Sequence, residues 1–364
     1  MSESDHIDRD RRRLLGAAAL ATAGARLGLF APVEPHVARA ALASPSENQL
    51  LSLASANAWL NSPALTAAGL RGKVVLVDFW TYTCINWIRT VPYVRAWAEK
   101  YKADGLVVIG VHAPEFEFEH ELTNVRRAVK EMRVDYPVAI DNDFAIWRAF
   151  RNQYWPALYL VGAEGEIRYR HFGEGDYADS ERAIQRRLAD AGARTVDRKL
   201  VSVEGRGIEV AADWASLKSP ENYVGYERTE GFASGDAVRD GPRLYATPAR
   251  LRVNQWALSG EWTMKRQAVV LNGAGGRIVT RFHARDLHLV MGSAARGSTV
   301  RFRVRVDGQP PGAAHGLDVD EQGNGRVSDQ RLYQLIRQPK PIVDRQLEIE
   351  FLDPGVEAFA FTFG

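Results

Sequence analysis

Hydrophobic and polar positions follow two different patterns along the chain. In the first part, continuous apolar runs alternate with segments that have helical spacing. The runs predict strands and the spacing predicts helices, with strands at 73–79, 106–111, 136–140, 158–161 and 167–172 and helices at 88–101, 119–133, 144–150 and 179–191. Alternation of buried strands with helices indicates an α/β sheet. Gly165 lies between the last two strands and predicts an antiparallel hairpin there.

From about residue 194 onward the helical spacing disappears and strand signals dominate. The segment 300–306 (VRFRVRV) alternates apolar residues with arginine, as expected of a strand with one face on a core and one in water. Similar segments are separated by Gly, Asp and Pro turns: IVTRFHA, LHLVM, LEIEFL and AFAFTF. This part of the chain predicts a β-sandwich.

These patterns divide the chain into domains and connecting segments. A stretch that contains Gly205, Gly207 and Pro220 has the composition of a linker. The predicted order is a signal-like segment 1–43, an N-terminal extension 44–69, an α/β domain 70–193, a linker 194–220 and a β-sandwich domain 221–364.

The N-terminal segment has the features of an export signal. Adjacent arginines at 11–13 precede an apolar run rich in Ala, Leu and Gly that continues to Phe30, the pattern of a twin-arginine signal. Small-residue steps predict cleavage near Ala41 or Ser44. We therefore expect an exported, periplasmic or otherwise extracytoplasmic protein with no membrane span after cleavage. The alternative is an uncleaved anchor, which the many alanines and glycines disfavour.

Composition and charge exclude several function classes. The chain has 364 residues, of which 46% are hydrophobic and 25% charged, a composition typical of globular proteins. The net charge is +2, which gives no excess to attract nucleic acid or an anionic membrane. There is one cysteine, so no internal disulfide can form. The sequence contains neither a phosphate-binding loop nor an established metal-ligand spacing, and we expect no cofactor and no metal.

The single cysteine, Cys84, follows a predicted strand and precedes a predicted helix, in the segment 77–87 (VDFWTYTCINW). Unpaired N–H groups and the dipole at a helix start stabilise a thiolate, which is the nucleophile of thiol-disulfide exchange. Far along the chain, Pro156 directly precedes a strand, at a position where we expect a cis peptide bond.

Residues 70–190 resemble the thioredoxin-fold domain of the TlpA/DipZ-like thiol-disulfide oxidoreductases. The resemblance rests on DFWTYTCIN, VIGVHAPEFEFE, YPVAIDND, RNQYWPALYLV and HFGEGDY. It continues into the second part, where NQWALSGEWT, GGRIVTRFHARDLHLVMG, RLYQLIRQ and EIEFLDPGVEAFAFTFG resemble the jelly-roll, carbohydrate-binding-module-like domain of DipZ-type proteins. The resemblance implies a thioredoxin-like α/β domain followed by an all-β sandwich, with a carbohydrate or a cell-envelope component as a ligand of the sandwich.

One position departs from the family pattern. The family motif is Cys-x-x-Cys, with an attacking and a resolving cysteine, whereas here Cys84 is followed by Trp87 at the second place. By the resemblance, Cys84 attacks and Pro156 lies beside it. A mixed disulfide at Cys84 then needs an outside thiol for its release. The predicted partners are accordingly substrate proteins or small thiols and disulfides.

Aromatic residues near Cys84 suggest a substrate-binding surface. If the fold brings Pro156 to the helix start, Trp80, Tyr82, Trp87 and Trp155 surround the thiol and suit an apolar peptide segment. Desolvation by these rings raises a thiol pKa, whereas the helix dipole lowers it. The sequence does not show which of the two effects is larger. Trp87 has an alternative interpretation as a simple packing residue.

Three functions remain open from the sequence. The first is exchange or isomerisation of disulfides by the one thiol, through a mixed disulfide. The second is a redox-inactive binding module, whose sandwich anchors the protein to an envelope partner. The third is a one-cysteine peroxidase, for which Thr81 and Cys84 have the matching spacing. Trp256 and Trp262 could stack on sugar rings, but a core position in the sandwich is the favoured interpretation.

Overall fold

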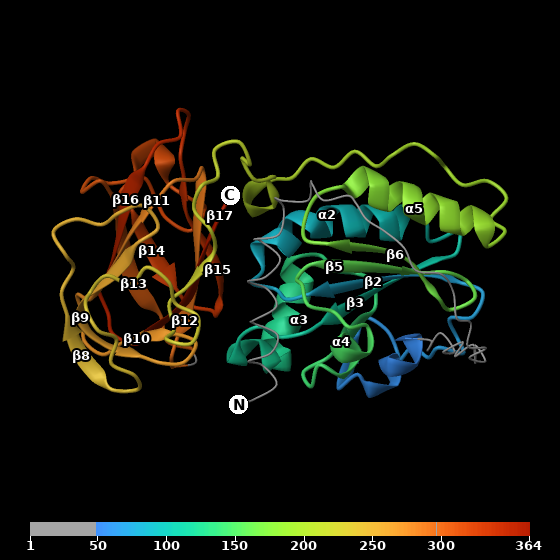
Figure 1. Cartoon of the computed structure of the whole chain (residues 1–364), viewed down its shortest axis with the longest axis horizontal. Coiled ribbons are helices and arrows are strands. Elements are labelled where there is room, and N and C mark those ends of the chain that lie inside the picture. Colours follow the sequence, from blue (N-terminus) through green and yellow to red (C-terminus); the bar gives the residue numbers. More distant parts are fainter. Residues whose placement is uncertain (1–48, 296) are drawn as a thin grey trace, which may run out of the picture.

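Two differently built halves lie side by side in the computed structural model of the protein (Figure 1). The structure describes residues 49–295 and 297–364. The first half is an α/β unit and the second consists mainly of antiparallel strands, so the fold class predicted from the sequence is confirmed. The predicted signal at residues 1–43 lies outside the described residues. Within the described ranges no helix is long and apolar enough to cross a membrane.

A six-stranded sheet forms the centre of the first half, in the order β1-β4-β3-β2-β5-β6. Its strands are β1 (Ala58–Leu60), β2 (Val74–Trp80), β3 (Leu106–His112), β4 (Val138–Ile140), β5 (Ala157–Val161) and β6 (Ile167–Phe172). β2, β3 and β4 are parallel, and β5 and β6 form the antiparallel hairpin predicted at Gly165. β5 also pairs antiparallel with β2, which brings the start of β5 beside the end of β2.

Helices cover both faces of this sheet, which explains why every residue of β2 is buried. One face packs on α2 (Ile85–Lys100), α3 (Leu122–Glu131) and α5 (Tyr177–Asp190). The other packs on the 3-10 helix η1 (Gln49–Ser55) and on α4 (Ala145–Ala149). Side chains of β2 alternate between the two cores, with Leu76 and Trp80 on the first and Val77 and Phe79 on the second.

The segment before β2 belongs to the sheet as well. η1 and β1 come from the residues that the sequence suggests as an N-terminal extension, and β1 pairs with β4 at the edge. A three-residue strand in polar surroundings has no recognisable period, which is why the sequence pattern did not reveal it.

The second half is a long antiparallel sheet that curls around its own core (Figure 1). Its strands are β7 (Asn222–Tyr223), β8 (Pro242–Tyr245), β9 (Trp256–Met264), β10 (Val269–Leu271), β11 (Arg277–Phe282), β12 (Asp286–Ser293), β13 (Val300–Val306), β14 (Asn324–Val327), β15 (Arg331–Arg337), β16 (Arg345–Phe351) and β17 (Val356–Phe363). β13 alternates buried and exposed residues, as predicted. Trp256 and Trp262 are buried in the core, which confirms the interpretation of both as core residues.

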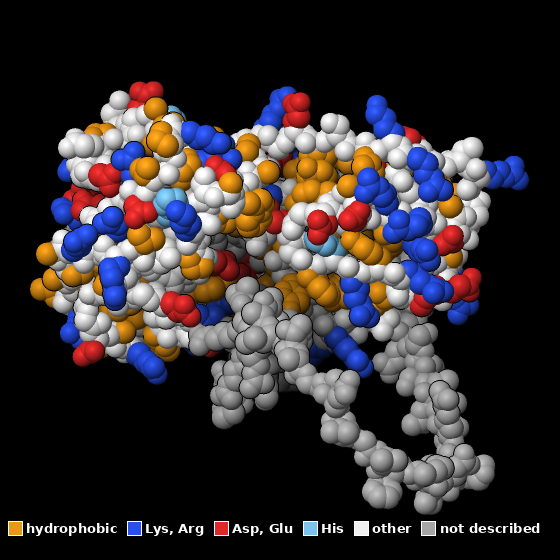
Figure 2. All heavy atoms as spheres, turned by 45° about the horizontal axis from the view of Figure 1, so that its top comes forward, with side chains coloured by type: hydrophobic (Ala, Val, Ile, Leu, Met, Phe, Trp, Pro, Cys, Tyr) orange, Lys and Arg blue, Asp and Glu red, His pale blue; other side chains and the backbone are white. Residues whose placement is uncertain are grey.

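One hydrophobic cluster joins the two halves. Leu332 and Phe359 of the second half belong to the same buried cluster as α2 and α3 of the first. The ring of Phe359 packs edge-on against that of Phe118, with 4.7 Å between centroids. Arg127 and Asp329 form an ion pair across the same contact. Lys and Arg are interspersed with Asp and Glu over the face seen in Figure 2, as expected of a nearly neutral chain.

The connection between the halves runs along α2 and α5 rather than through open space (Figure 1). It contains the short 3-10 helix η3 (Gly207–Glu209), where Glu209 pairs with Arg95 of α2 at 2.8 Å. The backbone N–H of Val201 donates to the carboxylate of Glu181 in α5 at 2.9 Å. These contacts hold the connecting segment in place, and the segment then continues toward the start of α2.

Candidate active site at Cys84

Cys84 occupies the turn between β2 and α2, directly before the first residue of the helix. Its carbonyl accepts a hydrogen bond from the N–H of Ile88 at 3.0 Å, the first bond of the helix. The thiol donates to the carbonyl oxygen of Trp155 at 3.7 Å. The Trp155–Pro156 peptide bond is cis, as the sequence predicts. The fold therefore brings Cys84 together with two residues that are distant in sequence, Trp155 and Pro156.

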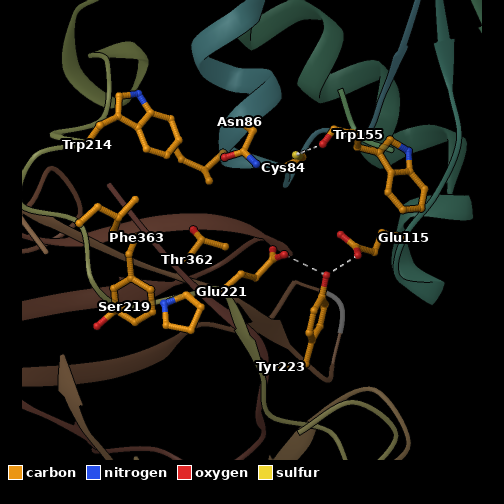
Figure 3. A pocket seen from close by; sticks show the side chains of 13 residues that line it. Cys84, Asn86, Glu115, Trp155, Trp214, Ser219, Glu221, Tyr223, Thr362 and Phe363 are labelled. Atoms are coloured by element: carbon orange, nitrogen blue, oxygen red, sulfur yellow. Dashed lines mark hydrogen bonds between the residues drawn. The ribbon is translucent and has the colours of Figure 1, made fainter. Parts of the chain in front are cut away.

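A pocket of about 190 Å³ lies at Cys84, between the two halves of the molecule (Figure 3). The start of α2, the loop after β3 and Trp155 form one side. The other side consists of residues from the connecting segment, the region around β7 and the end of β17. In Figure 3 the side chains of Thr362 and Glu221 lie across the pocket from Cys84 and Asn86. A ligand that reaches the thiol in this pocket is therefore enclosed by both halves.

The surroundings of Cys84 disfavour its thiolate form. The residue is half-buried. Burial raises the pKa of the Cys84 thiol well above its ordinary value, and the negative charges of Glu221 and Glu115 raise it further. The backbone N–H groups of Trp87 and Asn86 act in the opposite direction. Among these effects desolvation is the largest, and it acts against the stabilising effect of the helix start.

Acidic groups and a tyrosine form a linked set on one side of the pocket. The hydroxyl of Tyr223 donates to Glu115 Oε1 at 2.6 Å and lies 3.2 Å from Glu221 Oε2. Arg228 pairs with Glu115 at 3.1 Å and stacks on the ring of Tyr223, 3.4 Å from its centroid. Glu115 comes from the first half, whereas the tyrosine and the arginine come from the second. This set therefore joins the two halves beside the thiol.

A second carboxylate, Glu119, fixes the turn that carries Cys84. Thr83 donates its hydroxyl to Glu119 Oε1 at 2.6 Å, and the backbone N–H groups of Glu115 and Phe116 donate to Oε2 at 2.6 and 2.9 Å. Glu119 is fully buried, and burial raises its pKa to about 7. It thus ties the loop after β3 to the residue that precedes the cysteine.

Trp87 lies in the core, one helical turn after Cys84. Its side chain is 0% exposed and stacks on Trp80, with 4.2 Å between ring centroids. The indole Nε1–H donates to Asp78 Oδ2 at 3.0 Å, and the hydroxyl of Tyr136 donates to the same oxygen at 3.3 Å. Burial raises the pKa of Asp78 to about 7, although both hydrogen bonds lower it. Trp87 is therefore a packing residue that also partners a buried carboxyl group.

Both halves of the chain resemble domains of known proteins. Residues 49–184 match the family model described as Redoxin, and residues 219–364 match a thioredoxin-like C-terminal domain. Protein DipZ of Mycobacterium bovis is 34% identical over 309 residues, which are 84% of this chain and 41% of that protein. The chain thus consists of a redoxin-like domain followed by a thioredoxin-like C-terminal domain. It spans 41% of the length of the DipZ proteins of M. bovis and M. tuberculosis.

Shorter proteins match only part of the chain. The thiol-disulfide oxidoreductase YkuV of Bacillus subtilis is 29% identical over 138 residues, 38% of this chain and 93% of that protein. Among solved structures, a thioredoxin-like protein in its oxidised form has 31% identity and a TM-score of 0.35, and the match covers 37% of this chain and 90% of that one.

Three of the four aromatic residues that the sequence suggests as a substrate surface are not part of the pocket at Cys84. Trp80, Tyr82 and Trp87 are buried and do not line the pocket at Cys84. The reason is that Trp80 and Trp87 stack in the core between β2 and α2, while Tyr82 packs against His112, with 5.9 Å between ring centroids. Trp155 does line the pocket, and its Nε1–H donates to the carbonyl of Ala113 at 3.0 Å.

Several pocket residues were not foreseen from the sequence. They are Glu115, Trp214, Glu221, Tyr223 and Thr362. Apart from Glu115, they lie more than a hundred positions after Cys84, in the connecting segment or the second half. No motif or spacing links them to the cysteine, because only the packing of the two halves brings them there. Trp214 is the one of these residues that the sequence could have indicated, since a tryptophan within a polar linker-like stretch is unusual. In the structure its side chain is 62% exposed.

Proposed function

We propose that this protein performs one-thiol disulfide exchange, in which Cys84 forms a mixed disulfide with a ligand bound between the two halves. The observation that carries the proposal is the position of the sulfur. It borders a pocket and contacts the Trp155 carbonyl next to Pro156, while the place of a second cysteine holds the buried Trp87. The predicted ligands are a substrate protein segment or a small thiol or disulfide.

The exchange step balances with one cysteine. The Cys84 thiolate attacks one sulfur of a ligand disulfide, so the ligand S–S bond breaks and a new S–S bond forms to Cys84. The other ligand sulfur leaves as a thiolate and takes up the proton that Cys84 released. An external thiol, or a second thiol on the same ligand, then attacks the ligand sulfur of the mixed disulfide, so a new S–S bond forms to that sulfur, the bond to Cys84 breaks, and Cys84 leaves as a thiolate that takes up the proton of the attacking thiol. No net oxidation or reduction occurs, which suits isomerisation and exchange.

The raised pKa of Cys84 sets the kinetics of this chemistry. Because most of the thiol is protonated at neutral pH, attack is slow. Cys84 is also a poor leaving group for the same reason, so a mixed disulfide, once formed, persists. We therefore propose a long-lived adduct rather than rapid turnover.

Intact-protein mass spectrometry tests the proposal. The wild-type protein is incubated with a small disulfide or with a peptide that carries a disulfide, and Cys84→Ser serves as the control. We expect an adduct on the wild-type protein that an added thiol removes, and none on the variant. If the native protein forms no adduct while the urea-unfolded protein does, one-thiol exchange is wrong.

A redox-inactive binding module is the second candidate, and the same raised pKa favours it. In that case the pocket between the halves holds a ligand without covalent chemistry. Ligand affinity then stays unchanged in Cys84→Ser, whereas the exchange proposal expects capture to be lost. A peroxidase is less well supported, because peroxide oxidises the thiolate and burial disfavours that form.

We further propose export through the twin-arginine route, supported by the arginines at 11–13 and the apolar run that follows them. Cell fractionation with N-terminal sequencing tests this. The expected product is extracytoplasmic and begins near Ala41 or Ser44. Replacement of Arg12 and Arg13 by Lys is expected to retain the precursor inside the cell, and unchanged export of that variant rules out the route. A sugar or envelope ligand of the second half has no support from Trp256 or Trp262, which are buried.

A further inference from the structure

We infer that the pocket at Cys84 takes a low-molecular-weight thiol or disulfide that carries an ammonium group, an aminothiol, in preference to neutral and anionic ones. This inference rests on the proposed exchange chemistry at Cys84 and adds the class of substrate.

The size of the pocket limits the ligand. Its volume of about 190 Å³ is below the range of about 300 to 1,000 Å³ that is usual for drug-sized ligands. A small aliphatic disulfide fits a pocket of this size.

Contacts between the halves keep the pocket narrow. Phe118 packs on Phe359 behind it, and Glu115 pairs with Arg228 beside it. On the α2 side, the guanidinium of Arg89 donates to the carbonyl of Phe363 at 3.5 Å. These contacts hold the two sides of the pocket together.

The charge of the pocket selects among small ligands. Glu115 and Glu221 line it, whereas no Lys, Arg or His does so among the described residues. Arg228 pairs with Glu115 at 3.1 Å and its charge also acts on Glu221, so the two carboxylates and this guanidinium together leave one negative charge beside the pocket. An ammonium group is attracted to such a site and a carboxylate is repelled. A bound ammonium also offsets the carboxylates that disfavour the Cys84 thiolate, so the ligand itself promotes the attack.

A buried hydroxyl provides an independent observation. Thr362 is only 3% exposed, lines the pocket, and its Oγ1 has no hydrogen-bond partner among the described residues. In Figure 3 its side chain faces Cys84 across the pocket. A buried polar group without a partner is costly, and a ligand that hydrogen-bonds to it removes this cost. The hydroxyl can accept from an ammonium and donate to a second polar atom.

The chemical step is the exchange already described. For a symmetrical aminothiol disulfide, the Cys84 sulfur bonds to one half of the ligand, the ligand S–S bond breaks, and the other half leaves as the free aminothiol with the proton from Cys84.

The test compares three disulfide probes on the native protein: cystamine, which is cationic; bis(2-hydroxyethyl) disulfide, which is neutral; and glutathione disulfide, which is anionic. Rates of adduct formation are measured by mass spectrometry and divided by the rates with a free cysteine peptide. We expect the corrected rate to be highest for cystamine and lowest for glutathione disulfide. Raising the salt concentration from about 0.05 to about 0.5 M is expected to reduce the cystamine preference.

Variants identify the groups responsible. Glu221→Gln is expected to lower the cystamine preference over the neutral probe about two- to fivefold. Glu227→Gln, whose carboxylate pairs with Arg266 on the surface, is the matched control and is expected to change nothing. Thr362→Val is expected to slow the cystamine reaction, whereas the reaction with methyl methanethiosulfonate stays the same.

The outcomes separate the two proposals. If Cys84 reacts but prefers glutathione disulfide, or shows no preference that salt or Glu221→Gln can change, the aminothiol inference is wrong and one-thiol exchange stands. If no probe forms an adduct with the native protein, both fail. If Glu221→Gln does not fold, the salt dependence and Thr362→Val decide.

Discussion

At the scale of single residues, Trp87 limits the thiol chemistry of this protein to Cys84. An indole at the place of the second family cysteine cannot resolve a disulfide. It fills a closed space between β2 and α2 and donates to the buried carboxyl group of Asp78. Trp87 thus supplies packing and a hydrogen bond at this position.

Truncation of this side chain is expected to destabilise the protein. Trp87→Ala leaves a large cavity and takes a donor from Asp78, so we expect a loss of about 4 kcal/mol in the free energy of unfolding. Urea denaturation followed by circular dichroism measures the loss. Trp214→Ala, at an exposed site, is the control and is expected to change stability by less than about 0.5 kcal/mol. Equal effects of the two substitutions contradict the packing role.

The pH dependence of Cys84 alkylation tests the raised pKa. Because the thiolate is the reactive form, its rate with iodoacetamide is expected to rise about tenfold per pH unit through neutral pH and to keep rising beyond about pH 8.5, the ordinary thiol pKa. A cysteine peptide, measured in parallel, levels off near its own pKa. A plateau for the protein at lower pH than for the peptide means that the helix start outweighs burial.

At the scale of elements, the turn between β2 and α2 depends on the loop that follows β3. Glu119, in the short 3-10 helix η2 (Glu117–His120), accepts from Thr83 and from two backbone N–H groups of its own loop. The position of Cys84 is therefore set by a neighbouring loop as well as by its own helix.

Loss of the Thr83 hydroxyl is expected to loosen this turn. Thr83→Val leaves the buried Glu119 carboxylate without one donor, and we expect a destabilisation of about 1 to 3 kcal/mol. Faster alkylation of Cys84 is expected to accompany it. Thr263→Val is the control, because that hydroxyl bonds to Asn272 at the surface. Unchanged stability and alkylation in Thr83→Val contradict the anchoring role of Glu119.

At the scale of the whole molecule, the second half acts as a wall of the site. Residues from the connecting segment and from β17 enclose the thiol, and the shared core around Phe359 holds the halves together. Access to Cys84 therefore depends on a contact that lies outside the thioredoxin-like domain.

Weakening that contact is expected to open the site. Phe359→Ala removes the ring that packs on Phe116 and Phe118, so we expect a loss of about 3 kcal/mol in stability. Reaction of Cys84 with a polymer-linked maleimide is expected to accelerate more than reaction with N-ethylmaleimide. The control is Leu244→Ala, at an exposed position of the second half. If the two reagents respond equally to Phe359→Ala, the second half does not restrict access.

The sequence by itself determined the fold class and the longer elements. The continuous apolar run at 73–79, the helical spacing of α2 and the alternation in β13 depend only on residues close together in the chain, so the sequence alone was sufficient to predict them. It also placed Cys84 at a helix start and predicted the cis peptide bond before Pro156.

Tertiary structure decided the character of the site. That Trp87 points into the core, that burial and two carboxylates raise the pKa of Cys84, and that Thr362 faces the thiol all result from groups that folding brings together. Desolvation and Coulomb interactions depend on distance in space, and Cys84 and Thr362 meet only because the second half docks on the first. No periodicity in the sequence predicts this packing, because it depends on the shapes of the surfaces of the two folded halves.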